Sequence, residues 1–390
     1  MTYNKRGNFL RVILFAFLAA IFPLNMQASE HNEAEQGFNP GAFIIDHVID
    51  SYGWHIAGDG DKSISVSLPI ILFDNWKPVV FMSSKFHHGH AAYKGYAIGF
   101  TEETKGKIVK LGGPDAGYTG HLEEGHSYMI DNQSTLIDIS ITKNVFALLL
   151  SIILLCWIFL RVAKQYKDGG DNKAPKGMAA LVEPVIIFIR DEVAIPSIGK
   201  DKYEKFLPYL LTLFFFILIN NLMGLIPIFP FGANLTGNIA VTGILAIITF
   251  FITSFSANKN YWIHLVNTPG VPWWLKIPLP LMPVVEIIGI FTKPFVLMIR
   301  LFANITAGHI IVLGFISLIF IFGQMTPALG YGISVVSIFF YLFMGLLELI
   351  VAFVQAFIFT LLTALYIGMA IEDHEEHEEA HEATEIVHNN

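Results

Sequence analysis

Long apolar runs dominate the second half of the chain. Three of them are close to the roughly 20 residues that a helix needs to cross a bilayer: Val145 to Ala163, Phe206 to Ile226 and Ile239 to Phe255. Two more, Pro283 to Gly323 and Ile333 to Ala370, would form helices roughly 60 Å long, twice the bilayer core of about 30 Å. They predict a helical hairpin that is strongly tilted, broken or nearly flat in the membrane, with its turn at residues 324–332.

Residues 29–143 follow a different pattern, in which Gly and Pro separate short apolar segments. In the segment SISVSLPIILF, Ile64, Val66, Leu68 and Ile70 alternate with other residues and predict one strand with a shared apolar face. The segments KPVVFM, YKGYAIGF and GKIVKL are further strand candidates. We therefore expect a small, β-rich external domain before an all-α membrane domain of about five helices.

The two ends of the chain differ from both parts. Residues 1–28 look like a signal peptide, because basic residues precede the short apolar run Val12 to Phe22 and Ala28 offers a cleavage position. An uncleaved anchor is the alternative. Residues 372–390 belong to an acidic, His-rich stretch without Lys or Arg, which predicts a disordered tail. The membrane domain then covers residues 144–371.

Composition agrees with a membrane protein. The chain of 390 residues is 54% hydrophobic and 14% charged, whereas soluble proteins carry roughly 25% charged residues. The net charge of -8 makes nucleic acid an unexpected partner. Cys156 is the only cysteine, which excludes an intrachain disulfide and a zinc site built on several thiolates.

Basic residues predict the orientation in the membrane. They follow the first span, precede the second and follow the third, whereas the loops 227–238 and 323–332 contain no Lys or Arg. Because basic loops stay on the cytoplasmic side, we expect a multi-pass protein of the inner (plasma) membrane. Its N-terminal domain would be periplasmic and its C-terminus cytoplasmic. The segment MAALVEPVIIFIRDEVAIP, residues 178–196, predicts an amphipathic helix at the interface.

Polar residues inside the apolar runs are the candidates for function. An arginine at the bilayer centre costs about 2.5 to 3.5 kcal/mol, and such residues usually face the bundle interior or a water path. At 100° per residue, Glu286 and Asn304 fall within about 40° of the stripe of Arg300, whereas His309 points elsewhere. On the last run, Glu348 and Gln355 share a face.

Four asparagines are further channel candidates. Asn220 and Asn221 lie in the second span, and Asn234 and Asn238 are predicted to share a face at the start of the third. The alternative is that all four only form hydrogen bonds between helices. Lys293, beside Pro294, is interpreted as a structural residue whose ammonium reaches the membrane surface.

Histidines suggest a metal site only weakly. His87, His88 and His90 form a cluster without spaced acidic or Cys partners, so exposed loop histidines are the favoured interpretation. The tail histidines are compatible with weak zinc binding. No resident metal and no cofactor are expected.

Several blocks resemble, in order, the subunit a family of the F-type ATP synthase. They are NNLMGLIP, NLTGNIAVTG, PVVEIIGIFTKPFVLMIRLFANITAGH and ELIVAFVQAFIFTLLTALYIGMA, and the resemblance covers most of residues 140–372. It implies a proton-conducting stator that does no covalent chemistry alone and is part of the H+-transporting ATP synthase. The implied partners are a ring of subunit c, the peripheral stalk subunit b, the whole F1Fo complex and membrane lipid.

The resemblance also implies residue roles. Arg300 matches the essential stator arginine, flanked by Asn304 and Gln355. Glu286 matches an acidic position near the cytoplasmic half-channel, and His309 and Glu348 match two positions of the outer half-channel. The chain departs from some relatives at Gly224, where they carry Asp; Asn220 or Asn221 would supply the polarity there.

Two other functions remain open from the sequence. One is a stand-alone ion-coupled secondary transporter, although the chain shows no obvious internal repeat. The other is a metal-handling or assembly membrane protein that uses the histidines of the external domain and tail. Neither explains Arg300 in its apolar surroundings.

Overall fold

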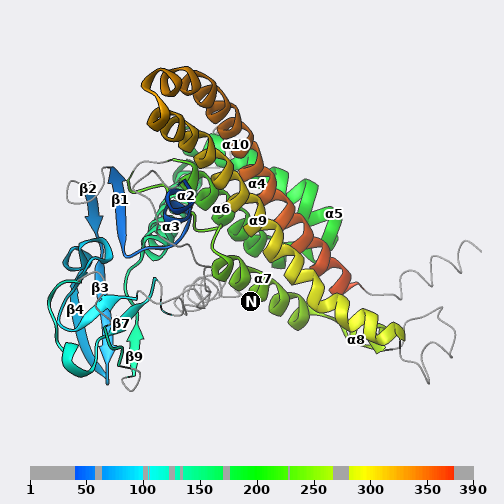
Figure 1. The fold of residues 1–390 in the computed structure, drawn as a ribbon. Coiled ribbons are helices and arrows are strands. Elements are labelled where there is room, and N and C mark those ends of the chain that lie inside the picture. The colour runs from blue at the N-terminus through cyan, green and yellow to red at the C-terminus, as the bar shows by residue number, and fades with distance from the viewer. Residues whose placement is uncertain are drawn as a thin grey trace, which may run out of the picture.

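Five long apolar helices dominate the computed structural model (Figure 1). The structure describes residues 40–372 except 58–63, 100–103, 105, 123–127, 132–134, 170–175, 227–228 and 267–280. Within these residues the helices long enough to span a membrane are α3 (Lys143–Gly169), α6 (Tyr203–Leu225), α7 (Ile239–Ser256), α9 (Leu281–Met325) and α10 (Pro327–Ile371). All five spans predicted from hydropathy are confirmed as helices. The predicted signal peptide and residues 373–390 of the predicted tail lie outside the described residues.

The last two helices form the predicted hairpin. Each contains 45 residues, and the arms pack against each other and curve toward their turn (Figure 1). α9 continues through Pro294, so the alternative of broken helices is wrong. The turn is sharp because Thr326 caps α10, its Oγ1 accepting from the Leu329 N–H at 3.3 Å, and Pro327 occupies the first helical turn.

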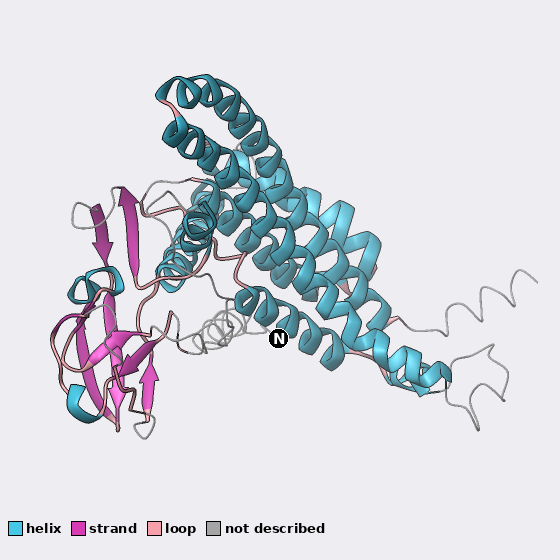
Figure 2. Ribbon diagram, viewed as in Figure 1, coloured by secondary structure: helices cyan, strands magenta, loops and turns pink. Residues whose placement is uncertain are grey.

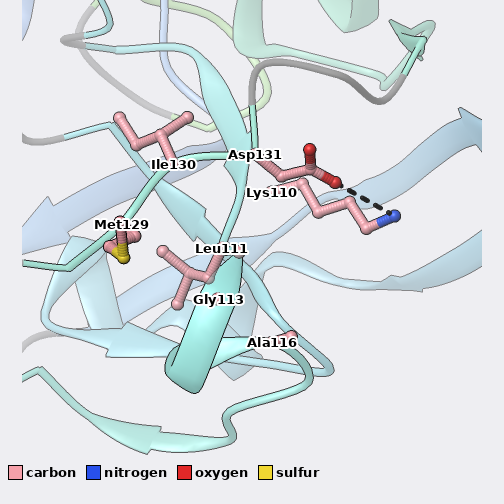
Figure 3. Close-up of a pocket in the computed structure, with 8 residues that line it drawn as sticks. Lys110, Leu111, Gly113, Ala116, Met129, Ile130 and Asp131 are labelled. Carbon is pink, nitrogen blue, oxygen red and sulfur yellow. Dashed lines mark ion pairs between the residues drawn. The ribbon is translucent and has the colours of Figure 1, made fainter.

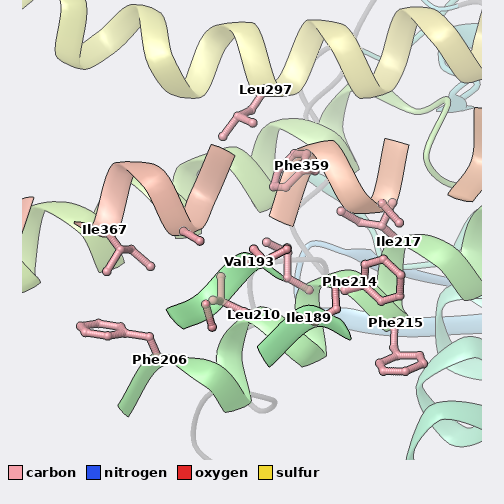
Figure 4. Packing of buried hydrophobic residues seen from close by; sticks show 14 of the residues in the cluster. Ile189, Val193, Phe206, Leu210, Phe214, Phe215, Ile217, Leu297, Phe359 and Ile367 are labelled. Carbon is pink, nitrogen blue, oxygen red and sulfur yellow. The ribbon is translucent and has the colours of Figure 1, made fainter. Parts of the chain in front are cut away.

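The membrane core surrounds α6. Leu210, Phe214 and Ile217 are fully buried and pack in one cluster with Phe359 and Ile367 of α10 (Figure 4). In a protein surrounded by water, burying a side chain of this size contributes about 1.5 to 3 kcal/mol to stability. In lipid this contribution is smaller, and close packing holds the helices together. α6 therefore fixes where the hairpin lies.

The helix predicted at residues 178–196 is present in three consecutive segments. They are α4 (Met178–Phe188), the π-helical turn η4 (Ile189–Ala194) and α5 (Ile195–Ile198). Its buried face includes Ile189 and Val193 and packs into the α6–α10 cluster, whereas Leu181 is exposed. α5 lies so close to α10 that a Cβ on Gly368 would stand 1.8 Å from the Ser197 carbonyl oxygen. Gly368 is thus required for this contact.

The C-terminal end of α10 is held by two other segments. The Ile371 carbonyl oxygen accepts hydrogen bonds from Lys202 Nζ at 3.0 Å and Asn258 Nδ2 at 2.9 Å, and the Asn258 N–H donates to the Ala370 carbonyl oxygen. These bonds satisfy carbonyls that a helix end leaves unpaired. Asn258 immediately precedes α8 (Lys259–Val266), so lysines from separate segments gather at this end.

The external domain consists of short antiparallel strands (Figure 2). β1 (Gly53–Ala57) pairs with β2 (Ile64–Ser67), and β3 (Pro69–Asp74) lies between β4 (Lys77–Met82) and β9 (Leu136–Asp138). The remaining pairs are β5 (Ala91–Ala92) with β8 (Gly120–His121) and β6 (Tyr96–Ile98) with β7 (Ile108–Lys110). Two short 3-10 helices are Ser83–Gly89 and Gly113–Asp115. The β-rich character is confirmed.

The single strand predicted around Ile64 to Ile70 is wrong. The chain leaves one sheet and joins another at Leu68, whose N–H donates to Ser83 Oγ at 3.0 Å and whose carbonyl accepts from the Ser83 N–H at 2.9 Å. The alternation survives the break, because Leu68, Ile70 and Leu72 are all buried. Side-chain periodicity therefore predicted the inward face but not the change of hydrogen-bond partner.

A short helix in this region was not predicted. α2 (Pro40–Val48) packs against α9, where the Phe43 and Phe320 rings lie 6.3 Å apart. A helix of nine residues is marginal in isolation, so docking on α9 stabilises it.

The external domain also contains an open pocket of about 520 Å³ (Figure 3). Its lining includes Met129, Ile130 and an ion pair of Lys110 Nζ with Asp131 Oδ2 at 3.7 Å. Lys110 also pairs with Asp74 at 2.8 Å. Burial opposes ionisation of Asp74, but hydrogen bonds from Lys110 and Tyr96 hold its pKa below the usual value. The charges of this pocket are thus matched within the domain.

Candidate functional site

His309 of α9 and Glu348 of α10 meet inside the hairpin. His309 Nδ1 lies 2.7 Å from Glu348 Oε1, and Glu348 is only 6% exposed. The same nitrogen lies 3.2 Å from the Ile305 carbonyl oxygen, and Nε2 lies 3.3 Å from the Gly224 carbonyl oxygen of α6. Both ring nitrogens therefore face oxygen acceptors. The two residues that the resemblance assigns to one half-channel thus lie together.

Two glycines make room for the pair. A Cβ on Gly308 would lie 3.0 Å from Glu348 Oε1 and 3.1 Å from its Cδ, tighter than most contacts in proteins. A Cβ on Gly224 would meet the His309 ring at an ordinary 3.7 Å. Gly308 thus lets the carboxyl lie directly against α9. A side chain at position 224 would point toward the imidazole.

Asn221, one helical turn before Gly224 in α6, connects α6 with α10 and with the loop before α7. Its Nδ2 donates to the Ala352 carbonyl oxygen of α10 at 3.0 Å, and its Oδ1 accepts from Thr236 Oγ1 at 2.6 Å. Asn220 Nδ2 donates to the Phe216 carbonyl oxygen, whereas its buried Oδ1 has no hydrogen-bond partner among the described residues. The bridging alternative thus applies to Asn221. Asn220 keeps one buried acceptor unused.

The prediction that Asn234 and Asn238 share a helix face is wrong. Asn234 lies in the loop before α7, where its Oδ1 accepts from the Gly237 N–H at 3.0 Å. Asn238 is the N-cap of α7 and accepts from the Ala240 N–H at 2.9 Å. Asparagine favours caps and turns because its side chain replaces missing backbone partners. Asn234 Nδ2, also buried, has no partner among the described residues.

Arg300 lies on another face of α9 and is exposed. The neighbouring Leu297 and Leu301 point into the bundle and are fully buried, whereas Phe295 and Ile299 are exposed beside Arg300. Among the described residues no carboxylate pairs with its guanidinium. Of the two surroundings expected for such residues, Arg300 thus does not face the bundle interior of this chain, and its exposure to a water path stays a prediction. Asn304, one turn along, is exposed as well.

The other two candidates lie further along the hairpin. Gln355 is buried on α10, whereas Glu286 is exposed near the beginning of α9. Burial and the nearby Glu286 carboxylate raise the pKa of Tyr261 in α8. Lys293 is half-buried, and its Nζ lies 5.4 Å from the centre of the Tyr366 ring of α10. Lys293 therefore helps to join the two arms, in agreement with its structural interpretation.

Metal ligands do not gather in the part of the chain that the structure describes. No group of three His, Cys, Asp or Glu side chains there is suitable for a metal ion. The closest feature in the external domain is the ring contact of His87 with His121 at 5.1 Å. Two histidines are fewer than the three or four ligands of a zinc site.

Sequence reasoning missed the supporting residues of the pair. Thr236 and Thr306 hold the loop before α7, through the Asn221 side chain and the Gly237 carbonyl oxygen respectively. Gly308, directly before His309, had a usable signal, because small residues at helix contacts in membranes allow close approach. Thr236 had none, since its partner is 15 residues away in a different element.

Comparisons with known proteins agree on the membrane domain. The model of the family "ATP synthase A chain" matches residues 145–368. A protein of Chloroherpeton thalassium named ATP synthase subunit a is 48% identical over 61% of this chain and 69% of its own length. One of Prosthecochloris aestuarii, named ATP synthase subunit a 2, is 41% identical over 82% of this chain and 96% of its own length.

The external domain matches a second family, one of unknown function, over residues 43–139. A further relative of the membrane domain is ATP synthase subunit a of Myxococcus xanthus, which is 42% identical over 60% of this chain and 74% of its own length. The family match over residues 145–368 covers more than half of the chain. The chain therefore belongs to the ATP synthase subunit a family.

Proposed function

We propose that this chain is the proton-translocating stator subunit a of an F-type ATP synthase, with Arg300 facing a rotating ring of subunit c. The observation that carries this assignment is the exposed, unpaired Arg300 on an apolar face of α9. A charge in lipid needs a partner. The described residues of this chain supply no carboxylate for it, and we assign that partner to a carboxylate on another chain.

Arg300 has the chemistry that a stator needs. A ring carboxylate must be neutral to face lipid and ionised to exchange its proton. Arginine stays charged at every ordinary pH, so it favours the ionised carboxylate and releases the bound proton without carrying protons itself. A fixed positive charge also prevents protons from passing directly between an outer and an inner water path. Asn304 and Gln355 are assigned to the same region as polar flanking residues.

The enclosed pair is suited to proton relay in the outer half-channel. When Glu348 is protonated, its O–H donates to His309 Nδ1 while Nε2–H donates to the Gly224 carbonyl oxygen. When the proton moves to Nδ1, the imidazolium still donates on both sides, to Glu348 and to Gly224. In the structure Glu348 Oε1 lies 2.7 Å from His309 Nδ1 but has no hydrogen-bond partner among the described residues, so in either state the relay forms this bond by realigning the two side chains. The proton then moves over the short distance between them.

Unused buried polar atoms extend this path. Asn220 Oδ1 and Asn234 Nδ2 lie on the elements that surround the pair and have no partner among the described residues. Buried polar atoms of this kind are ordinarily satisfied by water. We assign Asn220, Asn221, Asn234 and Asn238 to the walls of the outer half-channel, and Glu286 to the opposite, cytoplasmic half-channel.

The remaining features follow from this assignment. The hairpin lies strongly tilted in the inner membrane, so that its exposed apolar side follows the curved surface of the ring. The N-terminal domain is periplasmic, after a signal peptide at residues 1–28, and the C-terminus is cytoplasmic. The lysines gathered around the end of α10 support this orientation. Subunit b and the F1Fo complex complete the partners.

Co-purification and reconstitution test the proposed function. The chain should purify with the ring and the head of an ATPase, and vesicles should conduct protons only when both this chain and the ring are present. Transport of a solute by the chain alone would favour a secondary transporter. Tight stoichiometric zinc binding without the ATPase subunits would favour a metal-handling protein.

A further inference from the structure

Trp54 of the external domain is buried against the membrane domain. Its indole is 5% exposed and packs edge-on against Phe146 of α3, with ring centres 5.9 Å apart, and against Phe229, with centres 5.5 Å apart. Phe146 and Phe229 stack on each other at 6.0 Å. Ala233 belongs to the same buried cluster. Trp54 thus reaches the segment between α6 and α7, which we call the inlet loop (residues 229–238).

The inlet loop contacts the His309 site on its other side. The Gly232 N–H donates to the Met223 carbonyl oxygen at 2.9 Å, and the Ala233 carbonyl oxygen lies 3.4 Å from the Cβ position of Gly224. Gly224 is the residue whose carbonyl oxygen meets His309 Nε2. Movement of the loop is therefore transmitted to the backbone that orients the imidazole.

Two more bonds connect the inlet loop to the channel helices. Thr236 Oγ1 donates to Asn221 Oδ1 at 2.6 Å, and Thr306 Oγ1 of α9 donates to the Gly237 carbonyl oxygen at 3.3 Å. The loop is thus tied to α6 and α9 by hydrogen bonds and to the external domain by aromatic contacts.

The external domain is itself anchored beside Trp54. The Asp50 carboxylate accepts from the N–H groups of Ser51 at 3.0 Å and Asn144 at 2.9 Å, and the Lys143 N–H donates to the Ser51 carbonyl oxygen at 2.9 Å. The carboxylate therefore serves as a cap for the N-terminus of α3. This connection fixes the start of β1 relative to the first span, only a few residues before Trp54.

We propose that Trp54 is a positioning residue for proton uptake, through which the external domain fixes the inlet loop and so the orientation of His309. This inference rests on the proposed function. It gives the domain of unknown function a role in the ion path without making it carry protons. Within the described residues, the titratable side chains at the relay are His309 and Glu348, those beside Trp54 are Asp50 and Lys143, and residues 229–238 contain none.

The test uses the whole complex in membranes from which the soluble head has been stripped. Passive proton conductance is measured against outer pH and normalised to assembled subunit a. Trp54→Ala should lower the conductance about two- to thirtyfold, as expected for residues packed along such a network. It should also shift the outer pH at half-maximal conductance. Trp54→Phe, which keeps an aromatic ring, should restore most of the conductance.

Trp76→Ala is the matched control, because Trp76 belongs to the same domain and is 81% exposed. It should conduct like the unmodified chain. Phe229→Leu provides an independent variant if Trp54→Ala fails to assemble, since it removes the ring contact from the loop side. Conductance of either variant equal to wild type, or a loss without any shift in pH dependence, would overturn the inference.

The outcome is separable from that of the proposed function. If Glu348→Gln conducts like wild type, the proposed relay is wrong, whatever Trp54→Ala does. If Glu348→Gln is impaired but Trp54→Ala and Phe229→Leu are not, only the positioning role is wrong.

Discussion

Two faces of α9 differ in how their polar or charged side chains are surrounded. On one face, His309 is enclosed and has acceptors at both ring nitrogens, all from this chain. On the other, Arg300 is exposed among apolar side chains and has no carboxylate partner within the described residues. The contacts of the first site come from this chain, whereas at the second we propose that another chain supplies the partner.

The difference separates the contacts of His309, which lie within this chain, from the contact of Arg300, which we propose to be made with another chain. Leaving a buried polar group without its partner costs about 1–3 kcal/mol. A site whose contacts all lie within this chain can therefore be tested by measuring the coupling energy between its residues. An exposed charge contributes little to the stability of the chain alone. Substituting Arg300 should therefore change the activity of the assembled complex and hardly change the free energy of unfolding of the chain.

The largest effect should come from the exposed face. Arg300→Ala should abolish ATP-driven proton pumping, because no fixed charge then releases the ring proton or prevents leakage. Arg300→Lys should lose most of the coupling, since the planar guanidinium is lost. Quenching of a pH-sensitive dye in inverted vesicles measures the pumping.

ATP hydrolysis by the soluble head should remain possible in both variants. The free energy of unfolding of the purified chain should change by only about 0.5 kcal/mol or less. Pumping near the wild-type rate in either variant would show that Arg300 is not needed for proton pumping. The contrast between the two faces would then have no functional meaning.

The enclosed face should show coupling between its two members. Glu348→Ala or His309→Ala should slow proton uptake and also destabilise the chain by about 1–3 kcal/mol, because each leaves a buried polar group short of a partner. A double-mutant cycle should give a coupling energy of about 0.5–3 kcal/mol. The exchange His309→Glu with Glu348→His should conduct better than the worse single variant. Strictly additive losses would mean that the two side chains act separately.

A smaller effect should follow from reshaping the enclosed face without removing a polar group. Gly308→Ala brings a Cβ to 3.0 Å from Glu348 Oε1, so the carboxyl must move by a few tenths of an ångström. We expect a loss of proton conductance of about tenfold or less, since displacements near 1 Å cost about a hundredfold.

Gly314→Ala is the matched control for that variant, on the same helix. Its Cβ would have no neighbour within 4 Å, and alanine stabilises a helix by up to about 1 kcal/mol relative to glycine. Conductance through Gly308→Ala equal to that of the control would show that the carboxyl position is unimportant.

The smallest effect should come from the acidic tail. Truncation after Glu372 should leave assembly and pumping unchanged, because Ile371 and its hydrogen bonds to Lys202 and Asn258 are kept. A loss of pumping restored by any acidic tail would show that its negative charge gathers protons. A loss restored only by the native tail would indicate a role for its histidines.

Hydropathy predicted the spans because every helix that crosses lipid must pair its backbone polar groups internally and carry mostly apolar side chains. The bounds of α6 and α7 were within a few residues. The apolar runs predicted the hairpin but left open whether its arms are continuous, and α10 begins at Pro327, inside the predicted turn. The meeting of His309 and Glu348 could be expected, since they are buried polar groups on adjacent arms. Their contact with Gly224 could not, because it depends on how α6 crosses the hairpin.

Periodicity predicted which residues share a face, but not which face points inward. Arg300 shows the reason: in a membrane both faces of a helix are apolar, so composition does not distinguish a surface that contacts another helix from one that faces lipid. Asn234 and Asn238 show a second limit, because asparagines near a helix start serve equally well in turns and caps. α2 shows a third, since its stability comes from docking on α9.

The fastening of α10 has a mechanical consequence. At its C-terminal end Lys202 and Asn258 donate hydrogen bonds to the Ile371 carbonyl oxygen, and Gly368 lies directly against Ser197. Near the turn, by contrast, the described contacts are the Thr326 cap, the close approach of Gly330 to Gly323 and the packing of Phe43 on Phe320. Under the proposed function, a ring that turns against the hairpin would bend it about the end that is held by hydrogen bonds to other segments. Elastic deflection should concentrate near the turn, and hydrogen exchange in the assembled complex should be faster there than around Gly368. Such a hairpin would act as a spring that smooths the torque between successive proton transfers.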